Sequence, residues 1–159
     1  MNSLQKVRYY IKQHQLITNG DTIIVGISGG ADSVSLTHIL NTLKYEFGLK
    51  LILAHFNHHL RRSSRADQKF VEQFSRKIHL PLIVGKPASS LKNRKGSLEE
   101  NARKERLAFF YKIYKKYKAQ SVAVAHTQND LAETVLMRLL RGASLQGMRW
   151  ILVDRMIDG

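Results

Sequence analysis

The residues with the clearest chemistry form the segment Ser28–Ser33, Ser-Gly-Gly-Ala-Asp-Ser, directly after the β-branched run 23–27. Such a run is typical of a buried strand, and a helical pattern follows with Asp32 or Ser33 as its N-cap. The two glycines allow positive φ and leave room for a ligand. Backbone N–H groups gathered at a helix N-terminus bind anions. The segment therefore predicts a phosphate site, although a tight turn in a generic α/β domain gives a similar pattern.

A second candidate segment is Ala54–Arg61, Ala-His-Phe-Asn-His-His-Leu-Arg, at the end of another apolar run. Its three histidines allow a zinc site, which needs further ligands at fixed spacing, and they also suit a solvated basic loop. Because ligands of parallel sheets bind at the carboxyl ends of strands, we favour the lining of a nucleotide pocket. His55 and Phe56 are then expected near the adenosine, and Arg61 near phosphate or RNA.

Two charged groups follow along the chain. Glu99, Arg103 and Arg106 are spaced by helical turns, which is typical of an ordinary charged helix surface, although an arginine fork also suits phosphate. Asp130 and Glu133 are three residues apart at a predicted helix start. They either complement the helix dipole or hold a cation, such as Mg²⁺ or the ammonium groups of an amine substrate.

The elements that must position these residues alternate between helix and strand. Strands are predicted over 22–27, 50–56, 81–84 and 121–125, and helices over 3–15, 32–47, 66–79, 97–117 and 129–141. Gly48 is the expected C′ residue of the second helix, and Ser97 with Glu100 forms a capping box. Alternation of this kind predicts an α/β fold with a doubly wound parallel sheet.

The composition indicates a basic globular domain. Residues 1–159 suit a single domain, and the net charge of +14 favours polyanionic partners such as nucleic acid. The chain contains no cysteine, which excludes disulfides and thiolate chemistry within it. There is no apolar run of membrane-spanning length and no signal-peptide pattern, so we expect a cytoplasmic protein without a membrane partner.

Taken together, the segments resemble the N-terminal catalytic domain of the tRNA(Ile)-lysidine synthetases. That family belongs to the N-type ATP pyrophosphatases, whose pyrophosphate-binding PP-loop sits in a Rossmann-like fold. The resemblance is carried, in order, by Gly26–Ser33, Ala54–Arg61, Ser97–Arg106, Ala125–Thr134 and Arg138–Met148. The PP-loop alone indicates only the superfamily, whereas the last segments are specific to the family.

The resemblance implies a ligase that uses ATP and Mg²⁺. In such enzymes the C2 oxygen of the wobble cytidine of tRNA(Ile), anticodon CAU, attacks the α-phosphate of ATP and pyrophosphate leaves. The ε-amine of free L-lysine then attacks C2, releasing AMP and giving lysidine. The oligomeric state is left open by the sequence, with a homodimer as one option.

The resemblance also implies roles for individual residues. ATP binding is assigned to Ser28, Gly29, Gly30, Ala31, Asp32, Ser33, His55 and Phe56. Catalysis is assigned to Asp32, Arg103, Arg106 and Glu133. Substrate binding is assigned to Arg61, His126, Asp130 and Glu133. Among these, Asp32 is the expected Mg²⁺ ligand, the two arginines stabilise charge at the α-phosphate, and Glu133 helps to deprotonate the attacking amine.

Some features depart from the family or fit its rivals. Longer members carry C-terminal tRNA-binding domains, so the chain is expected to be a minimal form or a piece of a longer synthetase. Ala54 stands where many relatives have Asp. A tRNA thiolation enzyme shares the loop and the basic surface but typically carries sulfur on cysteines. A ligase like the NAD or GMP synthetases needs no such charge, and a non-catalytic RNA-binding module needs no phosphate loop.

Overall fold

The computed structural model describes residues 3–59, 63–87, 97–126 and 136–141. The helices are α1 (Ser3–Gln13), α2 (Ala31–Leu43), α3 (Ser64–Lys77) and α4 (Leu98–Lys116). The strands are β1 (Thr22–Gly26), β2 (Lys50–Phe56), β3 (Leu82–Gly85), β4 (Ser121–His126) and β5 (Leu136–Arg141). None of the described helices is both long and apolar enough to cross a lipid bilayer.

The strands form one sheet in the order β3-β2-β1-β4-β5. The first four are parallel, with Thr22 opposite Lys50 where β1 pairs with β2, and Ile23 opposite Ser121 where β1 pairs with β4. Strands are added on one side of β1 as far as β3, and the chain then returns to add β4 on the other side. This reversal confirms the predicted doubly wound α/β fold and makes the β1–β4 boundary a switch point.

The helix predicted over 129–141 is wrong for its second half. Residues 136–141 form β5, which pairs antiparallel with β4 from Ser121–Arg141 to His126–Leu136. Residues 129–135 lie outside the described part of the chain. A short apolar run such as Leu-Met-Arg-Leu-Leu-Arg fits a strand or a buried helix equally well by periodicity. Pairing decides in favour of the strand, because it satisfies the open edge of β4.

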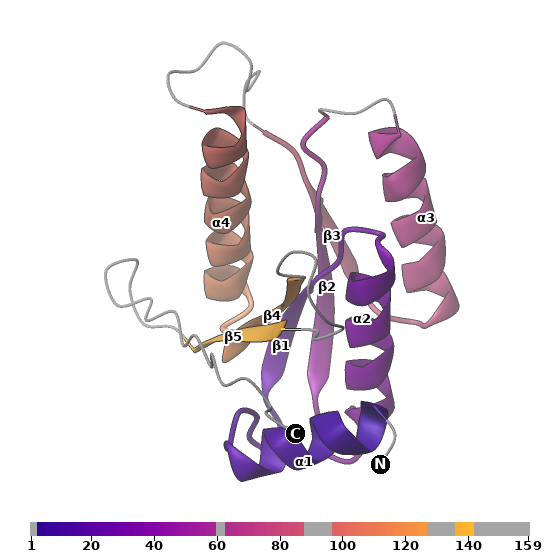
Figure 1. The fold of residues 1–159 in the computed structure, drawn as a ribbon, viewed down its shortest axis with the longest axis vertical. Helices are drawn as coiled ribbons and strands as arrows, with labels where there is room; N and C mark the ends of the chain where they lie inside the picture. The colour runs from indigo at the N-terminus through magenta and orange to yellow at the C-terminus, as the bar shows by residue number, and fades with distance from the viewer. Residues whose placement is uncertain (1–2, 60–62, 88–96, 127–135, 142–159) are drawn as a thin grey trace, which may run out of the picture.

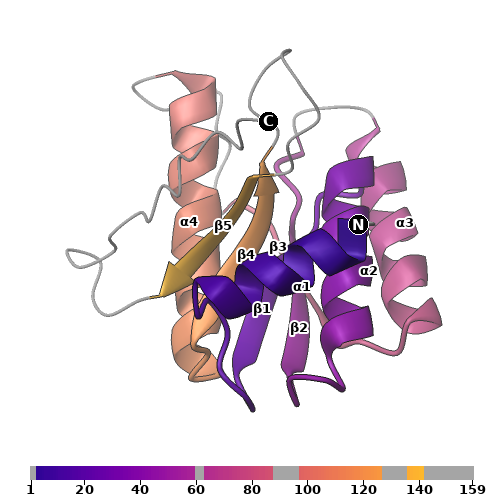
Figure 2. The same cartoon turned by 60° about the horizontal axis from the view of Figure 1, so that its bottom comes forward.

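Helices cover both faces of the sheet, as Figures 1 and 2 show: α4 lies on one side, and α2 and α3 lie on the other. Alternate residues of β1 point to the two faces. Ile23 and Val25 join the core under α1, α2 and α3 with residues such as Ile11 and Leu40. Ile24 joins a separate core under α4 with residues such as Phe110 and Ile113. The site must therefore lie between two independently packed layers.

Two strand glycines allow α4 to approach the sheet closely. A Cβ on Gly26 would lie 2.7 Å from Val124 Cγ1 and 3.0 Å from Phe110 Cζ, and one on Gly85 would overlap the Phe109 ring. Real Cβ atoms essentially never lie closer than 3.0 Å to another side chain, so the contacts with Val124 and Phe109 are not possible without a shift. The two positions therefore require glycine for packing, and they bring the aromatic residues of α4 to the carboxyl ends of β1 and β3.

Helix ends and faces differ in detail from the predictions. The N-cap of α2 is Gly30, without a side-chain hydrogen bond, rather than Asp32 or Ser33, and the helix ends at Leu43, before Gly48. Ser97 does cap α4, accepting a hydrogen bond from the Glu100 N–H at 3.1 Å. Two aromatic residues, Phe70 of α3 and Tyr117 at the end of α4, are 45% and 39% exposed.

Candidate nucleotide-binding site

The loop between β1 and α2 is closed by the hydroxyl of Ser33, whose side chain is buried. Ser33 Oγ accepts the Ser28 N–H at 3.1 Å and donates to the Gly30 carbonyl at 2.9 Å. Ser28 Oγ lies 3.0 Å from Ser33 Oγ and accepts the Gly30 N–H at 3.3 Å. Gly29, at φ +94°, makes the turn in a conformation that favours glycine.

Each serine hydroxyl has one proton, and this determines which oxygen donates and which accepts in these hydrogen bonds. The single Ser33 hydroxyl proton goes to the Gly30 carbonyl, since a carbonyl oxygen can only accept. The Ser28 hydroxyl must then donate to Ser33 Oγ, which leaves its own oxygen to accept from the Gly30 N–H. Because that last bond is long, an anion can compete for the Gly30 N–H with little loss. The loop is thus held in shape from its buried side and keeps its exposed side for a ligand.

The end of β2 joins this loop to α3. His55 Nδ1 lies 2.8 Å from the Ile27 carbonyl, so this nitrogen carries the proton and Nε2 is left as an acceptor. Nε2 is buried with no partner among the described residues. The buried amide of Asn57 donates to the Ser64 carbonyl at 3.1 Å and to Gln68 Oε1 at 2.9 Å. These bonds attach the start of α3 to the carboxyl end of the sheet.

The opposite wall is aromatic and cationic. Phe56 makes an edge contact with His58, with ring centroids 4.8 Å apart, and packs on Phe109 at 5.2 Å. Burial, followed by the charge of Arg103, lowers the pKa of the Arg106 guanidinium, which nevertheless stays protonated. Burial, and then the charge of Arg106, lower the pKa of the His58 imidazole. His58 is thus biased towards its neutral form beside a permanent cation.

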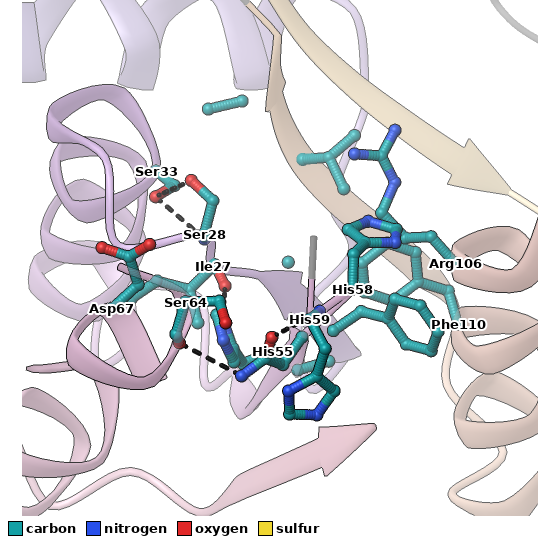
Figure 3. Close-up of a pocket in the computed structure, with 16 residues that line it drawn as sticks. Ile27, Ser28, Ser33, His55, His58, His59, Ser64, Asp67, Arg106 and Phe110 are labelled. Atoms are coloured by element: carbon teal, nitrogen blue, oxygen red, sulfur yellow. Dashed lines mark hydrogen bonds between the residues drawn. The ribbon is translucent and has the colours of Figure 1, made fainter. Parts of the chain in front are cut away.

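Between these walls lies a cavity of about 370 Å³, which falls within the range of small-ligand sites. Figure 3 shows hydroxyl and carboxylate groups on one side and His58, Arg106 and Phe110 on the other. The polar side is formed by Ser28, Ser33, Ser64 and Asp67. A cavity that offers hydroxyls and a guanidinium beside aromatic rings can bind an anionic ligand that also has an apolar part.

The structure brings some of the predicted residues together and leaves others apart. Five line the cavity: Ser28, Ser33, His55, Phe56 and Arg106. Gly29, Gly30, Ala31 and Asp32 belong to the same loop and the first turn of α2 without lining it, and Arg103 is exposed on α4. Arg61, Asp130 and Glu133 lie outside the described residues, as does the side chain of His126, whose backbone ends β4.

Sequence reasoning missed the contribution of α3. Asp67 and Ser64 line the cavity from its first turn, and the Asp67 carbonyl would lie 3.6 Å from a Cβ on Gly29. A signal was available, because Asp67 is the acidic residue of the first turn of a helix that follows a candidate strand end. From the sequence, His58 is distinguished only as one of the three histidines of Ala54–Arg61. Among the described residues, no three acidic, histidine or cysteine side chains gather as a metal site.

The oxygen atoms at the cavity can be compared with the ligands that Mg²⁺ prefers. Mg²⁺ takes oxygen ligands from carboxylates, waters and substrate phosphates rather than from a closed cage of side chains. The Asp67 carboxylate and the hydroxyls of Ser28 and Ser33 line one side of the cavity, and Asp32 stands in the first turn of α2. These oxygens fit an ion shared between the protein and a polyphosphate.

A loop that presents N–H groups at a switch point, with an arginine opposite, defines a nucleotide-binding α/β domain. A family model described as a PP-loop domain matches residues 3–157. The chain belongs to this family, whose use of ATP agrees with the phosphate site predicted from Ser28–Ser33.

Curated relatives extend the resemblance. The chain is 44% identical to a tRNA(Ile)-lysidine synthase from Symbiobacterium thermophilum, over 95% of this chain and 32% of that protein. It is 41% identical to the enzyme of the same name from Clostridioides difficile, over 92% of this chain and 32% of that protein. The predicted likeness to this family is therefore confirmed, and the chain spans about a third of the length of these relatives.

Solved structures share the fold at low sequence identity. A tRNA thiolase from Methanococcus maripaludis, solved with its [4Fe-4S] cluster, matches with a TM-score of 0.66 and 16% identity, over 76% of this chain and 43% of its own. An NH3-dependent NAD synthetase from Campylobacter jejuni matches with a TM-score of 0.56 and 15% identity, over 81% of this chain and 58% of its own. At this identity the matches support the fold alone.

The role of Ser33 can be tested by replacing it with alanine. The change leaves the Ser28 N–H and the Gly30 carbonyl without their partner, and we expect the free energy of unfolding to fall by about 1–3 kcal/mol. Ser35→Ala, at an exposed position of the same helix, is the matched control and should change it by less than about 0.5 kcal/mol. Urea unfolding measures both, and equal effects would refute the role given to Ser33.

The lowered pKa of His58 predicts a pH-dependent stability. In the unfolded chain the imidazole titrates near 6.5, and in the folded protein it takes up its proton only at lower pH. As the pH falls through this range the unfolded state gains protons first, so the free energy of unfolding decreases. His58→Gln should flatten that decrease between about pH 7.5 and about pH 5. Contributions of the other histidines are common to both proteins, so superimposable pH profiles would contradict the assignment.

Proposed function

We propose that the chain is the ATP-dependent catalytic domain of a tRNA(Ile)-lysidine synthase. The observation that carries this proposal is the 44% identity to an enzyme of that name over 95% of the chain. It is supported by the cavity at the switch point, where the PP-loop and Arg106 face each other. The activity, substrates and partners of the whole enzyme come to this chain from its relatives as part of the proposal.

In the first step, the triphosphate of ATP binds at the loop Ser28–Ser33. Backbone N–H groups of the loop, with that of Gly30 among them, contact the phosphates, while the α2 N-terminus adds its dipole. The C2 oxygen of the wobble cytidine attacks the α-phosphorus, and the bond from that phosphorus to the bridging oxygen breaks. Pyrophosphate leaves, and Arg106 stabilises the charge that develops at the α-phosphate, with Arg103 as the second candidate.

Mg²⁺, when bound, neutralises the negative charge of the leaving pyrophosphate. Asp32, in the first turn of α2, is the residue that we assign to it from the family resemblance, and Asp67 is a carboxylate that lines the cavity itself. Without a cation, a carboxylate beside a polyphosphate would repel it. The two acidic side chains are therefore consistent with binding of the nucleotide together with its metal ion.

The adenosine is assigned to the wall formed by β2. Phe56 offers an aromatic face, and the buried Nε2 of His55 offers an acceptor to a ligand N–H or O–H group. A buried acceptor without a partner costs free energy, so a nucleotide that donates to it gains both binding and orientation. This assignment keeps the adenosine on the apolar side and the phosphates on the polar side.

In the second step, the lysine ε-amine attacks C2 and AMP departs as the amine loses a proton. Asp130 and Glu133 are assigned to the ammonium groups of lysine, and Glu133 to the proton. His126 is assigned to the lining of this site, and Arg61 to phosphate or RNA. These four assignments rest on the family resemblance, because the side chains lie outside the described residues.

The partners follow from the same reading. The net charge of +14 suits tRNA, and the absence of cysteine from the chain disfavours sulfur transfer by a cysteine carrier, as in a thiolase. We assign residues 1–159 to one PP-loop domain of a synthetase that acts in the cytoplasm, where ATP and tRNA occur. A homodimer is the oligomeric state to be tested.

The proposal is tested by measuring pyrophosphate release from ATP by this chain. We expect release with a tRNA(Ile) transcript of anticodon CAU, and none with the same transcript carrying uridine at the wobble position. Addition of lysine should then convert the adenylylated tRNA to lysidine, detected by mass spectrometry of the nucleosides. Release that ignores the wobble base, or that is absent with both transcripts, would overturn the proposed function.

The two arginines of α4 are separated by a pair of substitutions. Because Arg106 lines the cavity and Arg103 is exposed, Arg106→Gln should lower kcat by roughly 100-fold, as for loss of one transition-state donor. Arg103→Gln should lower it by less than roughly 10-fold. Each serves as the control for the other, since both remove one charge from the same helix. The reverse order of effects would move the α-phosphate role to Arg103.

A further inference from the structure

The second half of α4 and the turn that follows it carry an exposed group of lysines away from the cavity. We call Lys112, Lys115, Lys116 and Lys118 the α4 lysine cluster, and all four are exposed. The first three are spaced i, i+3 and i+4, so they share one face of the helix. The opposite face, with Phe110 and Ile113, packs into the core against the sheet. The cluster is therefore held rigidly and points to solvent.

No acidic residue of the sequence lies near the cluster along the chain. Between Glu105 and Asp130 the sequence contains no Asp or Glu. The basic residues of α1 differ in this respect, because Arg8 and Lys12 both form ion pairs with Glu46, at 2.9 Å and 2.8 Å. Lys115 and Lys116 complement the dipole of the last turn, but Lys112 and Lys118 lie outside that turn.

Aromatic side chains alternate with these lysines. The Lys115 ammonium lies 5.6 Å from the Tyr111 ring centroid, and the Lys116 ammonium lies 5.5 Å from that of Tyr117. Tyr117 is 39% exposed, which makes its ring accessible. Cations interleaved with partly exposed aromatic rings favour a polyanion with stacking groups. Binding to a lipid surface would instead require exposed aliphatic side chains. On the described part of α4, Leu98 is the one large aliphatic side chain that is exposed.

The cluster and the cavity share one rigid element. At 1.5 Å per residue, Lys112 and Lys116 lie about 9 and about 15 Å along the helix from Arg106. A nucleic acid whose base enters the cavity has further phosphates within that distance on the same chain. Phosphate contacts position a nucleic acid without reading its sequence. The cluster is thus placed to hold the backbone that leads to the reacting base.

We propose that the α4 lysine cluster is a docking surface for the phosphate backbone of the substrate RNA, separate from the nucleotide cavity. The inference rests on the proposed function, in that the ligand is tRNA. It adds a surface that lies on the α4 side of the sheet and makes no contact with ATP. Its effect is on the affinity for RNA and on the salt dependence of that affinity, with the affinity for ATP unchanged.

The test compares two triple variants of equal charge. One carries Lys112→Gln, Lys115→Gln and Lys116→Gln. The control carries Lys69→Gln, Arg76→Gln and Lys77→Gln, three exposed cations of α3 on the other side of the sheet. Binding of a tRNA(Ile) transcript is measured by fluorescence anisotropy from about 50 to about 200 mM salt. Circular dichroism and the thermal shift caused by ATP show that both variants fold and bind nucleotide.

We expect the cluster variant to bind tRNA roughly 10-fold or more weakly and to lose about two from the salt slope, as for three phosphate contacts. The control should stay within roughly threefold of the unsubstituted protein. Equal losses in both variants would overturn the inference, because they would reflect net charge alone. Absence of tRNA binding by the unsubstituted protein would also overturn it.

Two further measurements distinguish an RNA-docking surface from a membrane-binding surface, and the docking surface from the proposed enzyme activity. Vesicles of phosphatidylcholine with phosphatidylserine replace the tRNA in the first. Loss of vesicle binding with tRNA binding unchanged would overturn the inference in favour of a membrane surface. The second arm measures pyrophosphate release with the CAU transcript. Specific loss of tRNA binding in the cluster variant supports the docking surface even if the unsubstituted protein releases no pyrophosphate, a result that would overturn the proposed function alone.

Discussion

The hydroxyl of Ser33 is the contact on which the site depends. One buried oxygen bonds to the backbone at both ends of the turn and to the Ser28 side chain. A strand that exits into a glycine turn has many conformations available, and ordering it costs entropy. The buried hydroxyl selects one of them before any ligand arrives. The Ile27 carbonyl is then in place for His55, and α3 packs beside Gly29.

Around this loop, the sheet separates two kinds of chemistry. The polar wall comes from elements on the α2 and α3 side, and the aromatic wall with Arg106 comes from α4. The walls meet at the switch point because the strand order reverses there. The crossovers through α2 and α3 lie on one face of the sheet, and the crossover through α4 lies on the other. The missing side chains at Gly26 and Gly85 complete the arrangement, since α4 could not otherwise bring Phe109 and Phe110 so close to the strand ends.

Much of this could be predicted from the sequence, because it depends on local patterns. The PP-loop, the four parallel strands and the Ser97 cap all follow from residue types over a few positions. Asp67 could not be assigned to the cavity in the same way, since its place depends on how α3 docks, through the buried amide of Asn57. The strand over 136–141 was also out of reach, because pairing with β4 rather than periodicity decides its conformation. Failures of both kinds come from contacts between residues distant in the chain.

Charge is arranged differently at two regions of α4, the cavity wall at Arg106 and the exposed lysine cluster. One carboxylate, of Asp67, and one guanidinium, of Arg106, line opposite walls of the cavity, and burial biases His58 towards neutrality. Such a site gains its power from oriented groups rather than from excess charge. The excess lies outside, where solvent screens each cation and pre-ordering is unnecessary. Because α4 carries both Arg106, which lines the cavity, and the lysine cluster, which faces solvent, a single helix fixes the distance between the two charged regions.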